Sequence, residues 1–172
     1  TLSQAMRDLG YDAYNETRSG GRLTELGVRM IQEMNRNGIV IDLSHTNDAC
    51  SLDIIETSAA PVVASHSNPR ERDPSLRNMP RDVMRALAAR GGVLGIMPPI
   101  TRPEGERPFT RIERAPMQTT LNYIRDAVDV MGIDYVGIGT HFNSAVLPWI
   151  TDALLAAGFA DEHVAQIMGG NF

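Results

Sequence analysis

Four short apolar runs, each followed by a segment with helical spacing, constrain the fold of this chain more than any other feature. The runs are GIVIDLSH (38–45), PVVASHS (61–67), GGVLGIMPP (91–99) and DYVGIGTHF (134–142). Continuous runs rich in valine and isoleucine, bounded by glycine or proline, are typical of strands buried on both faces of a parallel sheet. The sequence therefore predicts four parallel strands.

Apolar residues recur at helical spacing between these runs. One helix is predicted over 24–36, with Thr24 as its N-cap. Further helices are predicted over 47–57, from Pro80 to a stop at Gly91, and over 116–131, 147–157 and 161–168. This alternation predicts an α/β fold of parallel βα repeats within a single domain, 1–172. Four repeats make either half of a TIM-like barrel or a small open α/β sheet.

Composition and charge exclude several classes of function. The 172 residues carry a formal net charge of −5 at pH 7, which argues against a nucleic-acid-binding surface. No apolar run approaches the roughly 20 residues that a transmembrane segment needs. The basic cluster from Arg70 to Arg77 is interrupted by acidic residues, and we interpret it as a solvated loop. The single cysteine, Cys50, excludes an internal disulfide and is interpreted as a thiol that packs a helix.

Three of the four histidines fall at the carboxyl ends of predicted strands. They are His45, His66 and His141, whereas His163 lies in the last predicted helix. In a barrel these strand ends converge on one pocket, and imidazole is the commonest metal ligand in proteins. The positions therefore predict a shared metal or acid–base site. Ordinary hydrogen bonding at a strand end is the alternative for each histidine taken alone.

Polar residues beside the histidines suit supporting roles. Asp42 would point away from His45 in an alternating strand, so we expect it to brace the site rather than to bind a ligand directly. Ser65 and Ser67 flank His66 and can form hydrogen bonds in its outer shell, or simply cap the end of the strand.

Two loop features belong to the same predicted face. Arg77 follows the 61–67 run, where its fork of donors can clamp a substrate carboxylate or can simply be solvated. The segment 97–114 is long, rich in proline and arginine, and lacks periodicity, which is typical of a functional or disordered loop. Because it follows the third run, we expect it at the face where barrel active sites are built.

Together these segments resemble the membrane (renal) dipeptidase family, peptidase family M19. The resemblance runs from about Leu23 to Phe172, while 1–22 match poorly. It rests on LTELGVRMIQEMNRNGIVIDLSH, PVVASHSNPR, RNMPRDVMRALAARGGVLGIM, DYVGIGTHF and AQIMGGNF, in the family's order and spacing. It implies the second half of a TIM-like (β/α)8 barrel that carries two zinc ions and hydrolyses dipeptides. It further implies that His45 and His66 bind the second zinc and that Arg77 holds the dipeptide carboxylate.

The sequence departs from the family's pattern at three places. It has no His-x-Asp pair and no counterpart of the glutamate that bridges the two zincs, so we interpret the chain as a fragment in which at most the second zinc site is represented. The family's Asp-Phe-Asp pattern is replaced by His141, Phe142 and Asn143, so His141 takes the place of a catalytic aspartate. The family's substrate-contacting His or Tyr falls near Gln4, where the match is poor.

Three hypotheses for function follow. The first is a zinc-dependent dipeptidase in which His141 takes over proton transfer. The second is a catalytically impaired homologue that acts as a binding or scaffold protein. The third is a mononuclear amidohydrolase that holds one metal with His45, His66 and His141 and acts on small amides. Because four βα repeats leave two sheet edges open, we also expect a homodimer or pairing with a missing N-terminal half.

Overall fold

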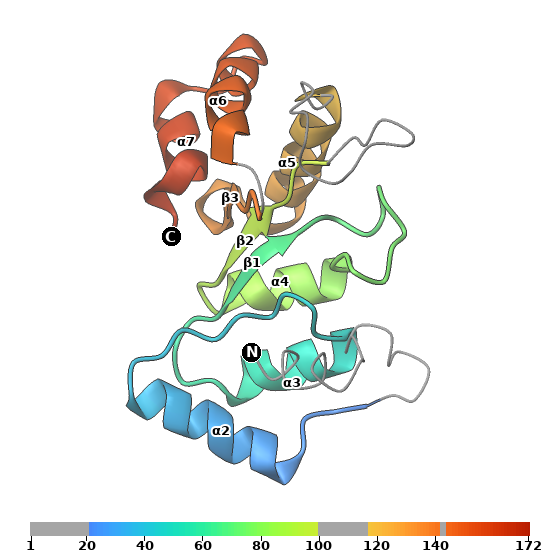
Figure 1. Ribbon diagram of the computed structural model, residues 1–172, viewed down its shortest axis with the longest axis vertical. Helices are drawn as coiled ribbons and strands as arrows, with labels where there is room; N and C mark the ends of the chain where they lie inside the picture. Colours follow the sequence, from blue (N-terminus) through green and yellow to red (C-terminus); the bar gives the residue numbers. More distant parts are fainter. Residues whose placement is uncertain (1–20, 100–116, 142–143) are drawn as a thin grey trace.

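The centre of the molecule is a three-stranded parallel sheet (Figure 1). The structure, a computed structural model, describes residues 21–99, 117–141 and 144–172. The strands are β1 (Val63–Ser67), β2 (Val93–Ile96) and β3 (Val136–Ile138), and they lie in that order. All four residues of β2 are buried, as the apolar runs predict for a central strand. The parallel α/β architecture is therefore confirmed.

The first expected strand is much shorter than predicted. It is reduced to one parallel bridge, between Asp42 and Val63. The Leu43 amide donates to the Val63 carbonyl over 2.7 Å, and the Val63 amide donates to the Ile41 carbonyl over 2.9 Å. The chain then leaves the extended conformation at His45, which has a φ of 71°. The segment is thus an edge beside β1, and the prediction of a full strand over 38–45 is wrong in its length.

Strands β2 and β3 are also shorter than their apolar runs. Gly91 has a φ of 74° and ends the preceding helix, so β2 begins only at Val93. Pro98 and Pro99 follow β2 and have no amide hydrogen to donate to a neighbouring strand. A 3-10 turn, Ile133–Tyr135, precedes β3 and takes up the start of the fourth run.

The expected helices are present with boundaries within a few residues of the prediction. The α-helices are α2 (Glu25–Arg36), α3 (Asp48–Thr57), α4 (Arg81–Ala89), α5 (Met117–Met131), α6 (Leu147–Ala156) and α7 (Asp161–Ala165). Two short turns complete the described chain, η3 (Ser144–Val146) and a π-helical turn, η4 (Gln166–Gly170). The main difference from the prediction is η4. The sequence predicts one continuous helix over 161–168, whereas the structure has an α-helix that changes to a π-helical turn at Gln166.

Local capping explains why the first helices begin where they do. The Thr24 side chain accepts a hydrogen bond from the Gly27 amide over 3.1 Å at the start of α2. The Asn47 side chain accepts one from the Cys50 amide over 2.8 Å at the start of α3. Each bond satisfies an amide that the helix itself leaves without a partner. Thr24 is therefore confirmed as an N-cap.

The helices pack on one another in chain order, and the parallel pairing of the strands puts their carboxyl ends at one edge of the sheet. Contacts join α2 to α3, α3 to α4, α4 to α5, and α5 to α6. Figure 1 shows α2, α3 and α4 at one end of the sheet and α5, α6 and α7 at the other. A single core of buried apolar side chains runs through both groups and the sheet, and it includes Ile31, Ile54, Leu87, Leu94, Ile124, Val136 and Leu154.

The C-terminal turn covers part of the β3 edge. The Asn171 side-chain amide donates to the carbonyls of Ile133 and Val136 over 2.7 and 2.8 Å. One of the two sheet edges that the repeat count leaves open is therefore partly satisfied by the chain itself. Within residues 21–99, 117–141 and 144–172, no helix is both long and apolar enough to cross a membrane.

Candidate metal centre

The structure brings His45, His66 and His141 together. One ring nitrogen from each lies within 4.8 Å of one from each of the others. The Nε2 atoms of His45 and His66 are 3.1 Å apart, and the ring centroids of His66 and His141 are 4.3 Å apart. His45 and His66 are half-buried, whereas His141 is exposed. His45 comes from the segment beside β1, His66 from β1 itself and His141 from the turn after β3, and their convergence agrees with the strand-end prediction.

Unusual backbone geometry aims all three rings. His45 and His141 have φ values of 71° and 57°, in the left-handed region that few residues other than glycine adopt. His66 lies in an irregularity of β1, where Ser65 and His66 together face a single residue of β2. Such a bulge bends a strand and redirects a side chain, and bulges are frequent beside active sites. Backbone strain of this kind is also typical of functional sites.

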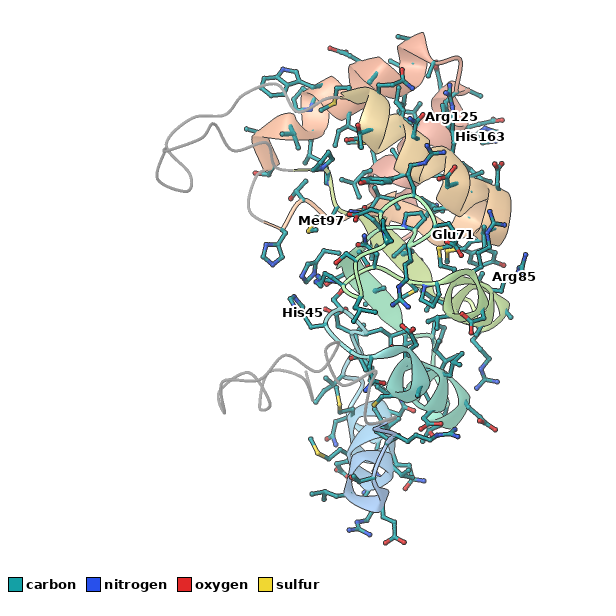
Figure 2. The ribbon with its side chains drawn as sticks, turned by 90° about the vertical axis from the view of Figure 1, so that its right-hand side faces the viewer. His45, Glu71, Arg85, Met97, Arg125 and His163 are labelled. Carbon is teal, nitrogen blue, oxygen red and sulfur yellow. The ribbon has the colours of Figure 1, made fainter. Side chains whose placement is uncertain are left out.

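Figure 2 shows which side of the molecule carries the cluster. His45 and Met97, which follows β2, lie on one side of the sheet. The labelled helix residues Arg85 and Arg125 lie on the opposite side. His163, the histidine that the sequence assigns to a helix, is on α7 and also lies away from the cluster (Figure 2).

The electrostatics of the cluster keep His66 neutral. Burial, the Arg77 guanidinium and His141 together lower the pKa of His66 to about 4. At pH 7 the ring is therefore uncharged, and a neutral imidazole is the form that binds a metal. Asp42 opposes this shift only in part, because its carboxylate favours the charged ring.

The spacing of the ring nitrogens fits a metal ion. Two histidine nitrogens bound to one tetrahedral zinc at 2.0–2.1 Å are about 3.4 Å apart. The 3.1 Å between the Nε2 atoms of His45 and His66 is close to that separation. The third ring, His141, is near enough to offer another nitrogen to the same ion. The three histidines can therefore hold a metal ion.

Asp42 and Ser65 support His66 from behind. The Ser65 hydroxyl lies 2.7 Å from Nδ1 of His66 and 2.6 Å from a carboxylate oxygen of Asp42. The Ser44 hydroxyl accepts a hydrogen bond from the His66 amide over 3.0 Å. Asp42 is not one of the grouped metal-ligating residues, which agrees with the expectation that it braces the site. Ser67 instead donates to the Arg77 carbonyl over 3.1 Å.

Arg77 lies against the histidines. Its Nη2 donates to the His66 carbonyl over 2.7 Å and is 3.2 Å from Nε2 of His45. The guanidinium therefore reaches the cluster from the loop after β1, as the candidate carboxylate clamp requires. A pocket of about 260 Å³, counting its open mouth, adjoins His45 and Arg77 and is also lined by Thr46, Asp48 and Asn78.

Sequence reasoning missed the ion pair that holds the Arg77 loop. Arg70 donates to both carboxylate oxygens of Asp48, over 2.5 and 2.7 Å, and also to the Asn78 carbonyl. Arg72 pairs in turn with Asp126. The interpretation of this basic cluster as a solvated loop is therefore wrong for Arg70, whose side chain is only 20% exposed. No local pattern predicts the pair, because Asp48 is 22 residues away in sequence.

Some predicted features lie outside the described residues. They are Gln4 and most of the 1–22 segment, the greater part of the 97–114 loop, and the pair Phe142 and Asn143. Cys50 is described, and it packs against the core from α3 as expected.

A parallel α/β fold that gathers three histidines at its strand ends defines an α/β protein with a candidate metal site. A family model described as membrane dipeptidase, peptidase family M19, matches residues 4–172. The chain belongs to this family. Its resemblance to M19 is thereby confirmed over nearly its whole length.

Individual relatives agree with this membership. The chain is 31% identical to dipeptidase verJ of Clonostachys rogersoniana over 99% of this chain and 45% of that protein. It is 29% identical to dipeptidase tcpJ of Claviceps purpurea over 99% of this chain and 42% of that protein. The chain therefore spans less than half the length of both relatives.

A solved structure of a metallopeptidase from Rhodobacter sphaeroides, liganded with a phosphinate mimic of the dipeptide L-Ala-D-Ala, is similar in fold. The match has a TM-score of 0.73 and 28% identity, and it covers 87% of this chain and 45% of that structure. The expected fold, part of the TIM-like barrel of M19 dipeptidases, is confirmed by this match.

Proposed function

We propose that the chain contributes the second metal site of a zinc-dependent dipeptidase. In this proposal His45 and His66 hold the zinc, and Arg77 binds the carboxylate of the dipeptide. The observation that carries it is the pair of Nε2 atoms 3.1 Å apart, with a nitrogen of His141 within 4.8 Å. Membership of a family whose relatives are named dipeptidases supports the choice of substrate.

The chain's own residues would bind and orient the substrate. A bound zinc would supply Lewis-acid polarisation of the scissile carbonyl. In a dipeptide that carbonyl and the terminal carboxylate are separated by one residue, a span of roughly 4 Å. Arg77 lies 3.2 Å from Nε2 of His45, so a carbonyl near the histidines leaves the carboxylate within reach of its fork of donors.

His141 has two candidate roles. As an exposed imidazole beside His66, it can transfer a proton near the scissile nitrogen, where the family's pattern has an aspartate. Its position within the three-histidine group also favours a second candidate function, a mononuclear amidohydrolase with His141 as the third metal ligand. The two functions differ in whether His141 is needed to bind the metal.

The remaining groups of a two-zinc site would come from outside these 172 residues. The sequence has no His-x-Asp pair, and it spans less than half of its relatives. We therefore assign to this chain the second zinc site and the carboxylate clamp only. Activity belongs to the protein that contains both halves of the barrel.

Calorimetric titration of the metal-free protein with zinc tests the proposal. We expect the zinc affinity of the His45→Ala/His66→Ala double variant to fall, because both proposed ligands are removed. The loss should exceed the roughly 10- to 100-fold loss that follows removal of an outer-shell partner. His163→Ala is the matched control, since His163 lies on α7 away from the cluster, and it should bind zinc normally. Unchanged zinc binding by the double variant would contradict the proposal.

His141→Ala separates the candidate roles in the same titration. Unchanged zinc affinity with slower dipeptide hydrolysis by the complete protein supports proton transfer. A loss of affinity comparable to that of His66→Ala supports the mononuclear site. Normal zinc binding without hydrolysis of any dipeptide would instead indicate the catalytically impaired homologue that acts as a binding protein.

A further inference from the structure

A chain of hydrogen bonds joins Asp42 to His66 through Ser65. One carboxylate oxygen of Asp42 is 2.6 Å from the Ser65 hydroxyl, and that hydroxyl is 2.7 Å from Nδ1 of His66. The other carboxylate oxygen accepts from the backbone amides of Ser44 and Ser65, over 2.9 and 3.0 Å. The carboxylate is thereby fixed in orientation by two amides and a hydroxyl.

The number of protons available determines the direction of these bonds. Burial alone would raise the pKa of Asp42, but hydrogen bonds from Ser65 and Ser44 outweigh it and lower the pKa below its ordinary value. The carboxylate can only accept, and the Ser65 hydroxyl has one proton to donate. That proton goes to Asp42, so the Ser65 oxygen must accept from His66. Nδ1 of His66 therefore carries the ring's proton.

The opposite ring nitrogen faces the candidate metal position. In a neutral imidazole with a proton on Nδ1, Nε2 carries the lone pair, which in the metal-free protein lies within hydrogen-bonding distance of Nε2 of His45. That Nε2 is 3.1 Å from Nε2 of His45, the pair whose spacing fits one metal ion. Metal-binding histidines commonly donate their other N–H to an outer partner, which sets the tautomer and the orientation of the ring.

We propose that Ser65, held by Asp42, is a positioning residue that fixes the tautomer of His66 so that Nε2 is presented to the metal. The bulge in β1 makes this possible, because it places Ser65 beside the ring of the next residue. The inference rests on the proposed metal site, but the tautomer itself is a property of the metal-free protein. The two can therefore fail separately.

Nitrogen-15 NMR of histidine-labelled, metal-free protein at pH 7.5 reads the tautomer directly. We expect His66 of the unchanged protein to carry its proton on Nδ1. Ser65→Ala should give a mixture of tautomers and a zinc affinity lower by roughly 10- to 100-fold. Ser65→Thr keeps a hydroxyl and should restore both. Ser67→Ala is the matched control, because Ser67 flanks His66 but donates to Arg77 instead.

Asp42→Asn tests the direction of the relay. The asparagine oxygen must stay with the amides of Ser44 and Ser65, so its NH₂ group faces the Ser65 hydroxyl. Ser65 then donates to Nδ1 of His66, and the ring proton moves to Nε2. We expect the tautomer to reverse and zinc affinity to fall, with the fold checked by the amide spectrum.

Two outcomes would overturn the inference. One is a proton on Nε2 of His66 in the unchanged protein. The other is an unaltered tautomer and zinc affinity in both Ser65→Ala and Asp42→Asn. If the unchanged protein shows the expected tautomer but binds no zinc, the proposed metal function fails, and with it the role of Ser65 toward a metal.

Discussion

Burial and neighbouring charge give individual side chains of this protein different chemistry from that of the free amino acids. His66 remains neutral well below pH 6.5 because burial and Arg77 disfavour its charged form. The pKa of Cys50 shifts in the opposite direction, because burial and the nearby Asp53 raise it from 9.0 to about 11. The first shift keeps the imidazole of His66 neutral at pH 7, whereas the second makes an unreactive thiol.

The thiol of Cys50 provides a prediction at this scale. Alkylation requires the thiolate, so the rate for the folded chain should rise about tenfold per pH unit and level off only near pH 11. The alkylation rate of the unfolded chain should level off near pH 9. At pH 8 this difference in thiolate fraction is about 100-fold. Mass spectrometry of iodoacetamide-treated protein measures both rates, and a folded-state plateau near pH 9 would contradict the assignment.

At the scale of elements, close approach of the strands determines the geometry of the centre. Gly139, directly after β3, and Gly95, in β2, both lie against the backbone of Ser65. A Cβ on Gly139 would lie 2.0 Å from the Ser65 carbonyl oxygen and 2.9 Å from Cα of His66. These contacts are with backbone atoms, which cannot rotate away. The position of His66 therefore depends on glycine in the neighbouring segments.

Gly139→Ala should therefore damage both the fold and the proposed metal site. We expect the free energy of unfolding to fall by about 1–3 kcal/mol, as in other overpacked positions, together with a loss of zinc affinity. Gly158→Ala is the control, because its φ of 84° strains alanine while no other atom lies near the added Cβ. Gly158→Ala should lower the free energy of unfolding without changing zinc affinity. Urea unfolding and calorimetry separate the effects, and normal zinc affinity in Gly139→Ala would refute this account.

At the scale of the whole molecule, the segment beside β1 leaves an apolar edge. Ile39 and Val40 are 53% and 67% exposed, and they precede the Asp42 bridge to β1. Leu26 and Met30 of α2 are exposed as well, at 61% and 41%. Exposed strand edges and apolar patches favour pairing with another chain or segment. We propose that the expected homodimer, or pairing with an N-terminal half of the barrel, would use this edge.

We expect the 172-residue chain to self-associate through this edge. Replacing Ile39 and Val40 by lysine should lower the average mass in light scattering, because charged edge residues oppose pairing. Leu155→Lys is the matched control, since Leu155 is 44% exposed on α6, and it should leave the mass unchanged. A monodisperse monomer of the unchanged chain would contradict the expectation.

Features that depend on neighbouring residues could be predicted from the sequence. Helix α2 follows from the spacing of its apolar residues and from the N-cap Thr24. The Thr24 side chain accepts a hydrogen bond from the amide of Gly27, three residues later. The parallel α/β class follows from the alternation of buried runs and helices. The strand-end positions of His45, His66 and His141 follow from the same runs. Each of these rests on interactions within one element or on the order of elements.

Features that depend on distant residues were decided by the tertiary structure. The first strand contracts to the Asp42 bridge, and the bulge at Ser65 appears only where β1 meets β2. Arg70 forms a hydrogen bond with Asp48, which is 22 residues away in sequence. Asp42 forms one with Ser65, which is 23 residues away. Periodicity carries no information about such pairs, because the partner depends on how strands are aligned. The sequence thus placed the three histidines at one face, while packing between segments set how their nitrogens meet.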